Sequence, residues 1–310
     1  MNIFPRGLTA RSMMWCKEVR PARSAPSARA SVRLVFLATS LLAVSLQARA
    51  APSPRPAADE AGHLATFEGA QRFFYNGDYD GAAAATQALC TVRPDDLGAC
   101  ELRTTSLLFQ IKKALRDTAA LDKSTAWERC ATCPSLLAAF QEETTRSQAF
   151  ARARLKSRAD DEAALFFLGK VDLNYVWLQL GIFGHKTGWD EYWEARKSLD
   201  RVLRMHPEHA RARVARAWVD YIVGTTVPTG VRWLLGGGNK KRGLRVVRDV
   251  AAQSDADVFV RAEATFALWD MQVRERDLPA AVATARTLGR DFPANAELQR
   301  FLTEHASPMP

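Results

Sequence analysis

The chain has almost no segment in which β-branched or aromatic residues alternate with polar ones. Such alternation is the usual sign of a strand with one buried face, so its scarcity argues against a sheet. Alanine, leucine, arginine and glutamate instead recur at spacings of three and four residues, which places them on one face of a helix. The sequence therefore predicts an all-α fold.

Sequence motifs of the common enzyme classes are missing as well. No Gly-x-Ser-x-Gly, His-Glu-x-x-His or calcium-loop pattern occurs. His206 and His209 lie around a proline, a spacing that fits a surface turn better than a pair of helical metal ligands. Asp95 and Asp96 precede an expected helix and fit an N-cap better than an acid–base pair. We therefore expect no catalytic residue, no metal and no cofactor.

Apolar runs are too short to span a bilayer, which takes about 20 residues. The longest, Leu34–Leu46, covers thirteen mostly apolar positions, follows Arg33 and is followed by an Ala-Arg-Ala sequence that ends at Ala50. A basic segment, a short apolar core and an A-x-A sequence are the three parts of a secretory signal peptide. We expect residues 1–50 to be this leader, with a long basic region, and the mature protein to be periplasmic or secreted. An uncleaved membrane anchor is the alternative.

The net charge of +9 belongs mainly to the leader. Residues 1–50 hold eight basic residues and one acidic residue; without them, the chain's 43 basic and 34 acidic residues fall to 35 and 33. A chain with nearly equal numbers of basic and acidic residues binds phosphate backbones poorly. We therefore expect no nucleic-acid partner. Residues 51–60 are rich in Pro and Ala and are interpreted as a linker. A helical domain is expected over residues 61–306.

Four cysteines remain after the leader, namely Cys90, Cys100, Cys130 and Cys133. Export permits disulfides, and four cysteines allow three pairings among which the sequence does not choose. The pair Cys130-x-x-Cys133 also fits half of a zinc site or a redox pair. Zinc would require Cys90 and Cys100 to converge on that pair, and a redox motif would require a βαβ context that is missing. Structural disulfides are therefore favoured.

One interval recurs along the mature chain: a small residue is followed twelve positions later by a Pro or Asp. The pairs are Ala82 and Pro94, Ala195 and Pro207, Gly243 and Asp255, and Ala281 and Pro293. After Ala195, the positions four and seven residues on are Leu199 and Val202, which lie on the same helical face. The small residue would let a neighbouring helix approach closely, and the Pro or Asp would end the helix.

This pattern resembles the tetratricopeptide repeat (TPR) family. Its small, aromatic, Gly, Tyr, Ala and Pro positions are matched by Ala70, Phe73, Gly77, Tyr79, Ala82 and Pro94. Leu168-Gly169 is similar to the family's Leu-Gly, and the last unit has Leu278, Ala281 and Pro293. The resemblance covers about residues 62–305 and implies a right-handed solenoid of about five to six helix hairpins.

The chain departs from the family in its spacing. The intervals between helix ends exceed the family's period of about 34 residues. Residues 117–134 replace one regular turn, and two intra-hairpin insertions are expected near Leu180–Gly188 and Gly224–Lys240. Connections within hairpins emerge at one edge of a solenoid, so the insertions should be neighbours that either pack on each other or present an apolar patch to a membrane surface or a partner. Their apolar residues include Trp177, Leu180, Phe183, Trp233, Leu234 and Leu235.

The stretch WLLGGGNKKRG, Trp233–Gly243, is glycine-rich and basic enough to raise the question of a phosphate-binding loop. Such a loop needs a preceding strand and a Lys followed by Ser or Thr, whereas Lys241 is followed by Arg242. Gly236–Gly238 would let the chain turn before Asn239, a good N-cap. We therefore expect a turn between two helices.

The resemblance favours a non-catalytic scaffold that binds a protein or peptide partner of the cell envelope in a groove lined by the first helices of the hairpins. The groove candidates are Phe67, Gln71, Tyr75, Lys170, Asn174, Trp218, Tyr221, Phe266 and Trp269. For the aromatic residues, burial between helices is the competing interpretation. The alternative function is a transporter accessory that holds a small apolar ligand between the insertions.

Overall fold

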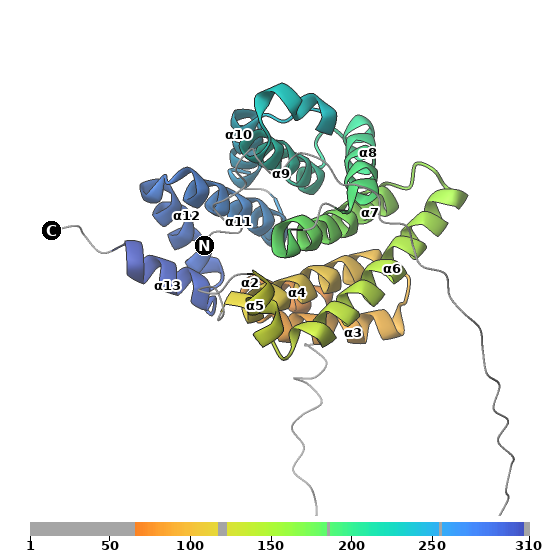
Figure 1. Ribbon diagram of the computed structural model, residues 1–310, viewed down its shortest axis with the longest axis horizontal. Coiled ribbons are helices and arrows are strands. Elements are labelled where there is room, and N and C mark those ends of the chain that lie inside the picture. Colours follow the sequence, from red (N-terminus) through yellow and green to blue (C-terminus); the bar gives the residue numbers. More distant parts are fainter. Residues whose placement is uncertain (1–65, 117–122, 185–186, 254–255, 307–310) are drawn as a thin grey trace, which may run out of the picture. The chain divides into compact units, whose positions relative to one another are not determined.

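The computed structural model describes residues 66–116, 123–184, 187–253 and 256–306, and these residues form helices and connecting turns without any strand (Figure 1). The all-α prediction is confirmed for this part of the chain. The expected leader (residues 1–50) and the linker (51–60) lie outside the described residues. All described residues belong to one compact unit.

The unit is built of helices that follow one another with short connections. In chain order they are α2 (Phe67–Tyr75), α3 (Tyr79–Val92), α4 (Leu97–Arg116), α5 (Lys123–Arg129), α6 (Cys133–Ser157), α7 (Glu162–Val176), α8 (Trp189–Met205), α9 (Ala210–Thr226), α10 (Lys240–Ala251), α11 (Val258–Glu275), α12 (Leu278–Asp291) and α13 (Ala296–His305). A π-helical segment, η2 (Trp177–Phe183), extends α7, and a 3₁₀ segment, η3 (Thr229–Leu235), lies between α9 and α10. Consecutive helices pack on each other, most extensively α7 on α8, α9 on α10 and α3 on α4.

Most helices begin at a polar residue that caps the first turn. The Asp161 side chain accepts a hydrogen bond from the Ala164 backbone N–H, and Asp96 accepts one from Ala99. His209 caps α9 through Nδ1, which accepts from the Ala212 N–H at 3.1 Å. The turn predicted around His206 and His209 is therefore confirmed, because it connects α8 to α9.

The recurring small residues lie in the interior, and at Gly243 the neighbouring helix comes very close. Ala82, Ala195 and Ala281 are fully buried. A Cβ atom placed on Gly243 would lie 2.6 Å from the backbone oxygen of Ala217 on α9, closer than any real contact. The helices can reach this separation only because Gly243 has no side chain.

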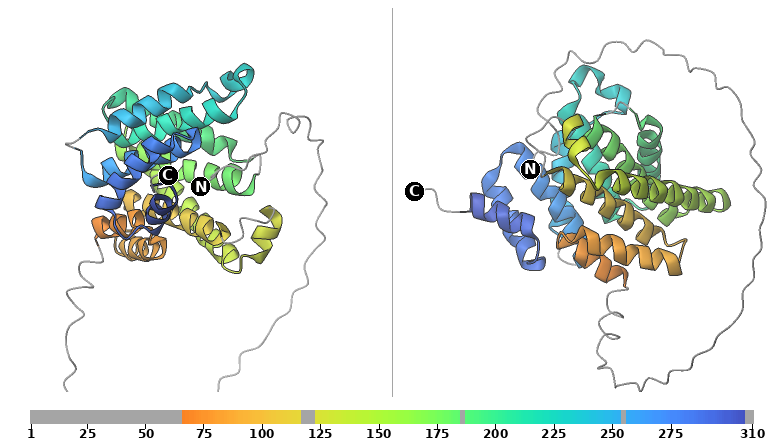
Figure 2. Two further views of the ribbon diagram at one scale, coloured as in Figure 1. Left: turned by 90° about the vertical axis from the view of Figure 1, so that its left-hand side faces the viewer. Right: turned by 60° about the horizontal axis from the view of Figure 1, so that its bottom comes forward.

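The first helices contact the last ones. The Tyr75 ring stacks on Phe259 and Phe266, with centroids 6.0 and 5.5 Å apart. The Asn295 side-chain amide donates to the Tyr75 carbonyl at 2.8 Å, joining residues 220 positions apart. Figures 1 and 2 show the blue C-terminal helices beside the orange N-terminal hairpin. The chain therefore brings its N-terminal and C-terminal hairpins into direct contact.

Candidate functional site

The segment expected as the first insertion is packed against neighbouring helices. It forms η2, in which Leu178 is fully buried beside Ile111 and Phe140. The Phe183 ring lies 4.8 Å from Trp127 and the Trp177 ring 5.9 Å from Trp218, both edge-on. These side chains pack against other parts of the same unit.

The second insertion is only partly covered. Leu235 packs, together with Leu180 of the first insertion, against the buried cluster that contains Val176 and Val223. Trp233 and Leu234 instead point away, with exposed fractions of 71% and 54%. The two insertions thus share one apolar cluster, and η3 carries an exposed apolar pair as well.

Side-chain hydrogen bonds hold η3 in place. The Tyr192 hydroxyl donates to the Leu235 carbonyl at 2.8 Å, and the Arg196 guanidinium donates to the Leu235 and Gly236 carbonyls. The Arg232 guanidinium donates to the carbonyls of Val227 and Gly224 at 2.8 and 2.7 Å. The exposed pair is therefore presented on an anchored backbone.

The glycine-rich stretch that follows is a helix connection. Gly236 and Gly237 adopt φ values of +73° and +81°, in the left-handed region that favours glycine. The Asn239 side chain accepts from the Arg242 N–H at 2.9 Å and caps α10. No strand precedes it, since the chain arrives from η3. The turn expected from the sequence is confirmed.

The aromatic groove candidates divide by burial. Tyr75, Tyr221 and Trp269 are buried among other side chains, and the Tyr221 hydroxyl donates to Glu275 at 2.9 Å. The structure thus supports the competing interpretation, burial between helices, for these three. The half-buried aromatic candidates are Phe67, Trp218 and Phe266, and the polar candidate Gln71 is half-buried too.

Lys170 is engaged within a charged cluster that we call the inner tetrad. Its ammonium lies 2.5 Å from Glu263 and 3.8 Å from Glu101. Arg211 contacts the same two carboxylates at 2.6 and 3.6 Å. Burial opposes the charge of Glu263, but Arg211 and Lys170 lower its pKa to about 2. The tetrad joins α4, α7, α9 and α11 and satisfies its own charges.

Asn174, the other polar groove candidate, also bonds within the protein. Its amide donates to the hydroxyls of Thr104 and Thr105 on α4, at 2.9 and 2.8 Å. Sequence reasoning placed Lys170 and Asn174 on an inner face but missed Glu101, Arg211 and Glu263. The one available signal is that each of the three is a charged residue on a helix with many buried positions.

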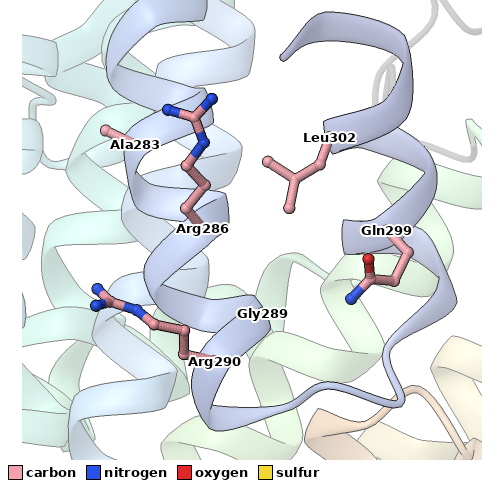
Figure 3. A pocket seen from close by; sticks show the side chains of 6 residues that line it. All are labelled: Ala283, Arg286, Gly289, Arg290, Gln299 and Leu302. Atoms are coloured by element: carbon pink, nitrogen blue, oxygen red, sulfur yellow. The ribbon is translucent and has the colours of Figure 1, made fainter. Parts of the chain in front are cut away.

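An open pocket of about 600 Å³ lies between α12 and α13 (Figure 3). Its lining combines two cations with small, amide and apolar groups: Ala283, Arg286, Gly289, Arg290, Gln299 and Leu302. Within the described part of the chain, neither arginine has a carboxylate partner, and Arg290 donates only to the Thr287 hydroxyl at 3.3 Å. None of the sequence-predicted site residues lines this pocket.

Cys130 and Cys133 form a disulfide at the start of α6, which removes them from any four-cysteine zinc site. Cys90 and Cys100 are buried thiols with sulfur atoms 3.6 Å apart. The hydrogen bond to Cys100 lowers the pKa of Cys90 to about 7, whereas the same bond and burial raise that of Cys100.

Cys90, Cys100 and Glu143 place three ligand atoms within 4.8 Å of one another, as a metal site would. The Glu143 carboxylate, however, is held by Arg146 at 2.6 Å and by Arg103 at 3.2 Å. Two guanidinium groups beside the carboxylate oppose a divalent cation electrostatically, so this arrangement suits a dithiol or disulfide better than a metal.

None of the helices that the structure describes is both long and apolar enough to cross a bilayer. In comparisons with known proteins, the chain matches no protein-family model, no curated protein and no solved structure.

Proposed function

We propose that the chain is an exported, non-catalytic scaffold, a right-handed TPR-like solenoid of helix hairpins that binds a protein or peptide partner of the cell envelope. The close helix crossings at the recurring small residues, such as Ala195 and Gly243, support the repeat architecture. The leader-like N-terminus of the sequence supports export.

The open pocket between α12 and α13 is the observation that carries the binding function. The inner tetrad and Asn174 use their polar groups within the protein, so the inner helices offer few free donors to a partner. Arg286 and Arg290 are exposed one helical turn apart, and Leu302 supplies an apolar wall between the helices. This combination fits a peptide segment with acidic side chains and one apolar side chain.

A peptide selection tests this assignment. Residues 51–310 are used to select from a displayed random peptide library, and the affinity of an enriched peptide is measured by fluorescence polarisation. We expect acidic peptides with an apolar residue, and a loss of affinity of at least about tenfold in the R286E/R290E variant.

The matched control is R242E/R245E, which makes the same charge change on α10 and should retain the peptide. Enrichment of peptides whose binding is insensitive to R286E/R290E would place the binding surface elsewhere.

The alternative function, a carrier of a small apolar ligand between the insertions, has less support. Trp177, Leu178 and Phe183 pack against α4, α5, α6 and α9, and Leu180 and Leu235 pack against one protein cluster. The pocket between α12 and α13 shares no residue with either insertion.

A further inference from the structure

The proposed peptide pocket between α12 and α13 includes no residue of η3 or α10, and two features of these segments have no role in it. The first is the exposed apolar pair, Trp233 and Leu234, on the anchored 3₁₀ segment. Large apolar side chains with this exposure are few in the described residues, and two of them are consecutive here. An exposed Trp beside an exposed Leu marks an interaction surface better than an isolated apolar residue does.

The second feature is the outer face of α10. Lys241, Arg242, Arg245 and Arg248 are all exposed and lie along one side of the helix. None of these four cations has a carboxylate partner within the part of the chain that the structure describes. The opposite side is apolar and buried, with Val247 and Val250 fully covered.

The local charge is strongly positive. Asp249 is the single acid of α10, and among the residues that the structure describes Lys240 is the one α10 cation with a carboxylate partner, Glu275 at 2.7 Å. Only the connection Gly236–Asn239 separates the end of η3 from the first turn of α10. Along the chain, the exposed apolar pair is therefore followed directly by a row of exposed cations.

We propose that this surface, made of Trp233, Leu234 and the four free cations of α10, docks on an anionic phospholipid membrane. Tryptophan and leucine side chains partition into the boundary between headgroups and acyl chains, and neighbouring Lys and Arg side chains are attracted to anionic headgroups. A fluid bilayer accepts a protruding Trp without a preformed pocket, which a protein partner would have to supply. The nearly balanced charge of the mature chain disfavours nucleic acid.

The geometry fits surface docking and not insertion across the membrane. η3 is seven residues long, and its backbone is tied to α8 through Tyr192 and Arg196. Trp233 and Leu234 can enter the interface while α10 stays outside, with its buried side still packed on α9.

Flotation with lipid vesicles tests the proposal, using residues 51–310. The probes are vesicles of phosphatidylcholine alone and of phosphatidylcholine with phosphatidylglycerol. We expect the wild-type chain to float with the anionic vesicles, less so at high salt, and to stay in solution with the neutral ones. The W233A/L234A and R242E/R245E variants should each weaken the binding at least about tenfold. These side chains are exposed or unpaired, so both variants should fold, which circular dichroism checks.

The R286E/R290E variant on α12 is the matched control, because it changes the net charge by the same amount at the proposed peptide pocket. It should float as the wild type does. Equal loss in R286E/R290E and R242E/R245E would show a non-specific charge effect and overturn the proposal. The proposal would also be overturned if the wild-type chain did not float with anionic vesicles. If, in that case, the binding of a selected peptide depended on Trp233, this surface would be a protein-docking site. Because the peptide assay uses α12 and the flotation assay uses η3 and α10, either result can fail alone.

Discussion

Asp172 on α7 is a carboxylate in the interior. Its side chain is fully buried, and its Oδ1 accepts a hydrogen bond from the Gln148 amide at 2.8 Å. Burial, with the nearby charge of Glu194 as the next contribution, raises the pKa of Asp172 to about 8. The folded chain therefore holds a proton at pH values where the unfolded chain, with a carboxyl pKa of about 3.9, has lost it.

This raised pKa predicts a fall in stability with rising pH. Protonated Asp172 contributes to the free energy of unfolding. This contribution is fully present below about pH 4 and is lost as the pH rises towards the folded-state pKa of about 8. In Asp172→Asn, which removes the charge and keeps an acceptor for Gln148, this loss should disappear, so the variant should be more stable by about 1–3 kcal/mol at alkaline pH. Urea unfolding on both sides of neutrality measures the difference. Asp249→Asn, an exposed change, is the control, and parallel pH curves for wild type and Asp172→Asn would contradict the assignment.

The thiols of Cys90 and Cys100 are placed to form a second disulfide. Their sulfur atoms are 3.6 Å apart on α3 and α4, and the two cysteines are ten positions apart in the sequence. With oxidised glutathione as the oxidant, the Cys90 thiolate would attack one sulfur of the glutathione disulfide and release the other half as glutathione thiolate. Cys100 would then lose its proton and displace the bound glutathione, which leaves as a second thiolate. We expect about 2–3 kcal/mol of added stability.

Non-reducing peptide mass spectrometry identifies the linkage, and urea unfolding of oxidised and reduced chains measures its effect. The C90S/C100S variant should show no such difference. A zinc ion retained by the reduced chain and lost in C90S/C100S would be incompatible with this reading of the Cys90, Cys100 and Glu143 group.

At the scale of single side chains, the sequence does not reveal which residues bond to each other within the protein. It suggested Lys170 and Asn174 as residues of a partner-binding groove. Their partners, however, lie 93 residues away at Glu263 and 70 residues away at Thr104, a distance along the chain that no local pattern encodes. The burial of Tyr75 likewise depends on the rings of Phe259 and Phe266 on the distant helix α11. Tyr221 is buried with Val247 of α10 and with Leu268 and Met271 of α11.

Helices and their caps were within reach of the sequence. Apolar spacing and capping residues are local signals, and they indicate where a helix forms and where it begins. The exact forms of the insertions were not predictable, because η2 is shaped by packing on Trp127 and Trp218, and η3 by hydrogen bonds from Tyr192 and Arg196. Such tertiary contacts decide whether a short segment becomes π or 3₁₀.

The crossing of α9 and α10 gives a prediction for a whole element. A methyl group at Gly243 would lie 2.6 Å from the Ala217 carbonyl oxygen and 3.0 Å from the Tyr221 backbone nitrogen, so Gly243→Ala must push α10 outward. We expect a loss of about 1–3 kcal/mol in urea unfolding, although alanine is the better helix former. Gly230→Ala is the control, because a methyl group there meets no atom within 4 Å. Equal stability of the two variants would mean that α9 and α10 are not in close contact at this point.

Across the whole unit, the contact between its first and last helices distinguishes this chain from an open stack of repeats. In an open stack each hairpin contacts only its neighbours, and stability is a sum of local terms. Here the rings of Tyr75, Phe259, Phe266 and Phe292 form one cluster, and Asn295 joins α13 to the end of α2. Unfolding should therefore be more cooperative than repeat architecture alone implies.

Asn295 offers a test of the coupling between the first and last helices, because its side chain bonds to both α13 and the end of α2. Its Oδ1 accepts from the N–H groups of Glu297 and Leu298 and caps α13, while its amide donates to the Tyr75 carbonyl. Asn239 makes only the cap of α10, through Arg242. Asn239→Ala should thus cost about 1 kcal/mol, and Asn295→Ala about 1 kcal/mol more, in urea unfolding. Hydrogen exchange separates the two effects: Asn295→Ala should speed exchange in α2 as well as in α13, whereas a change confined to α13 would show that the two ends of the chain are stabilised independently.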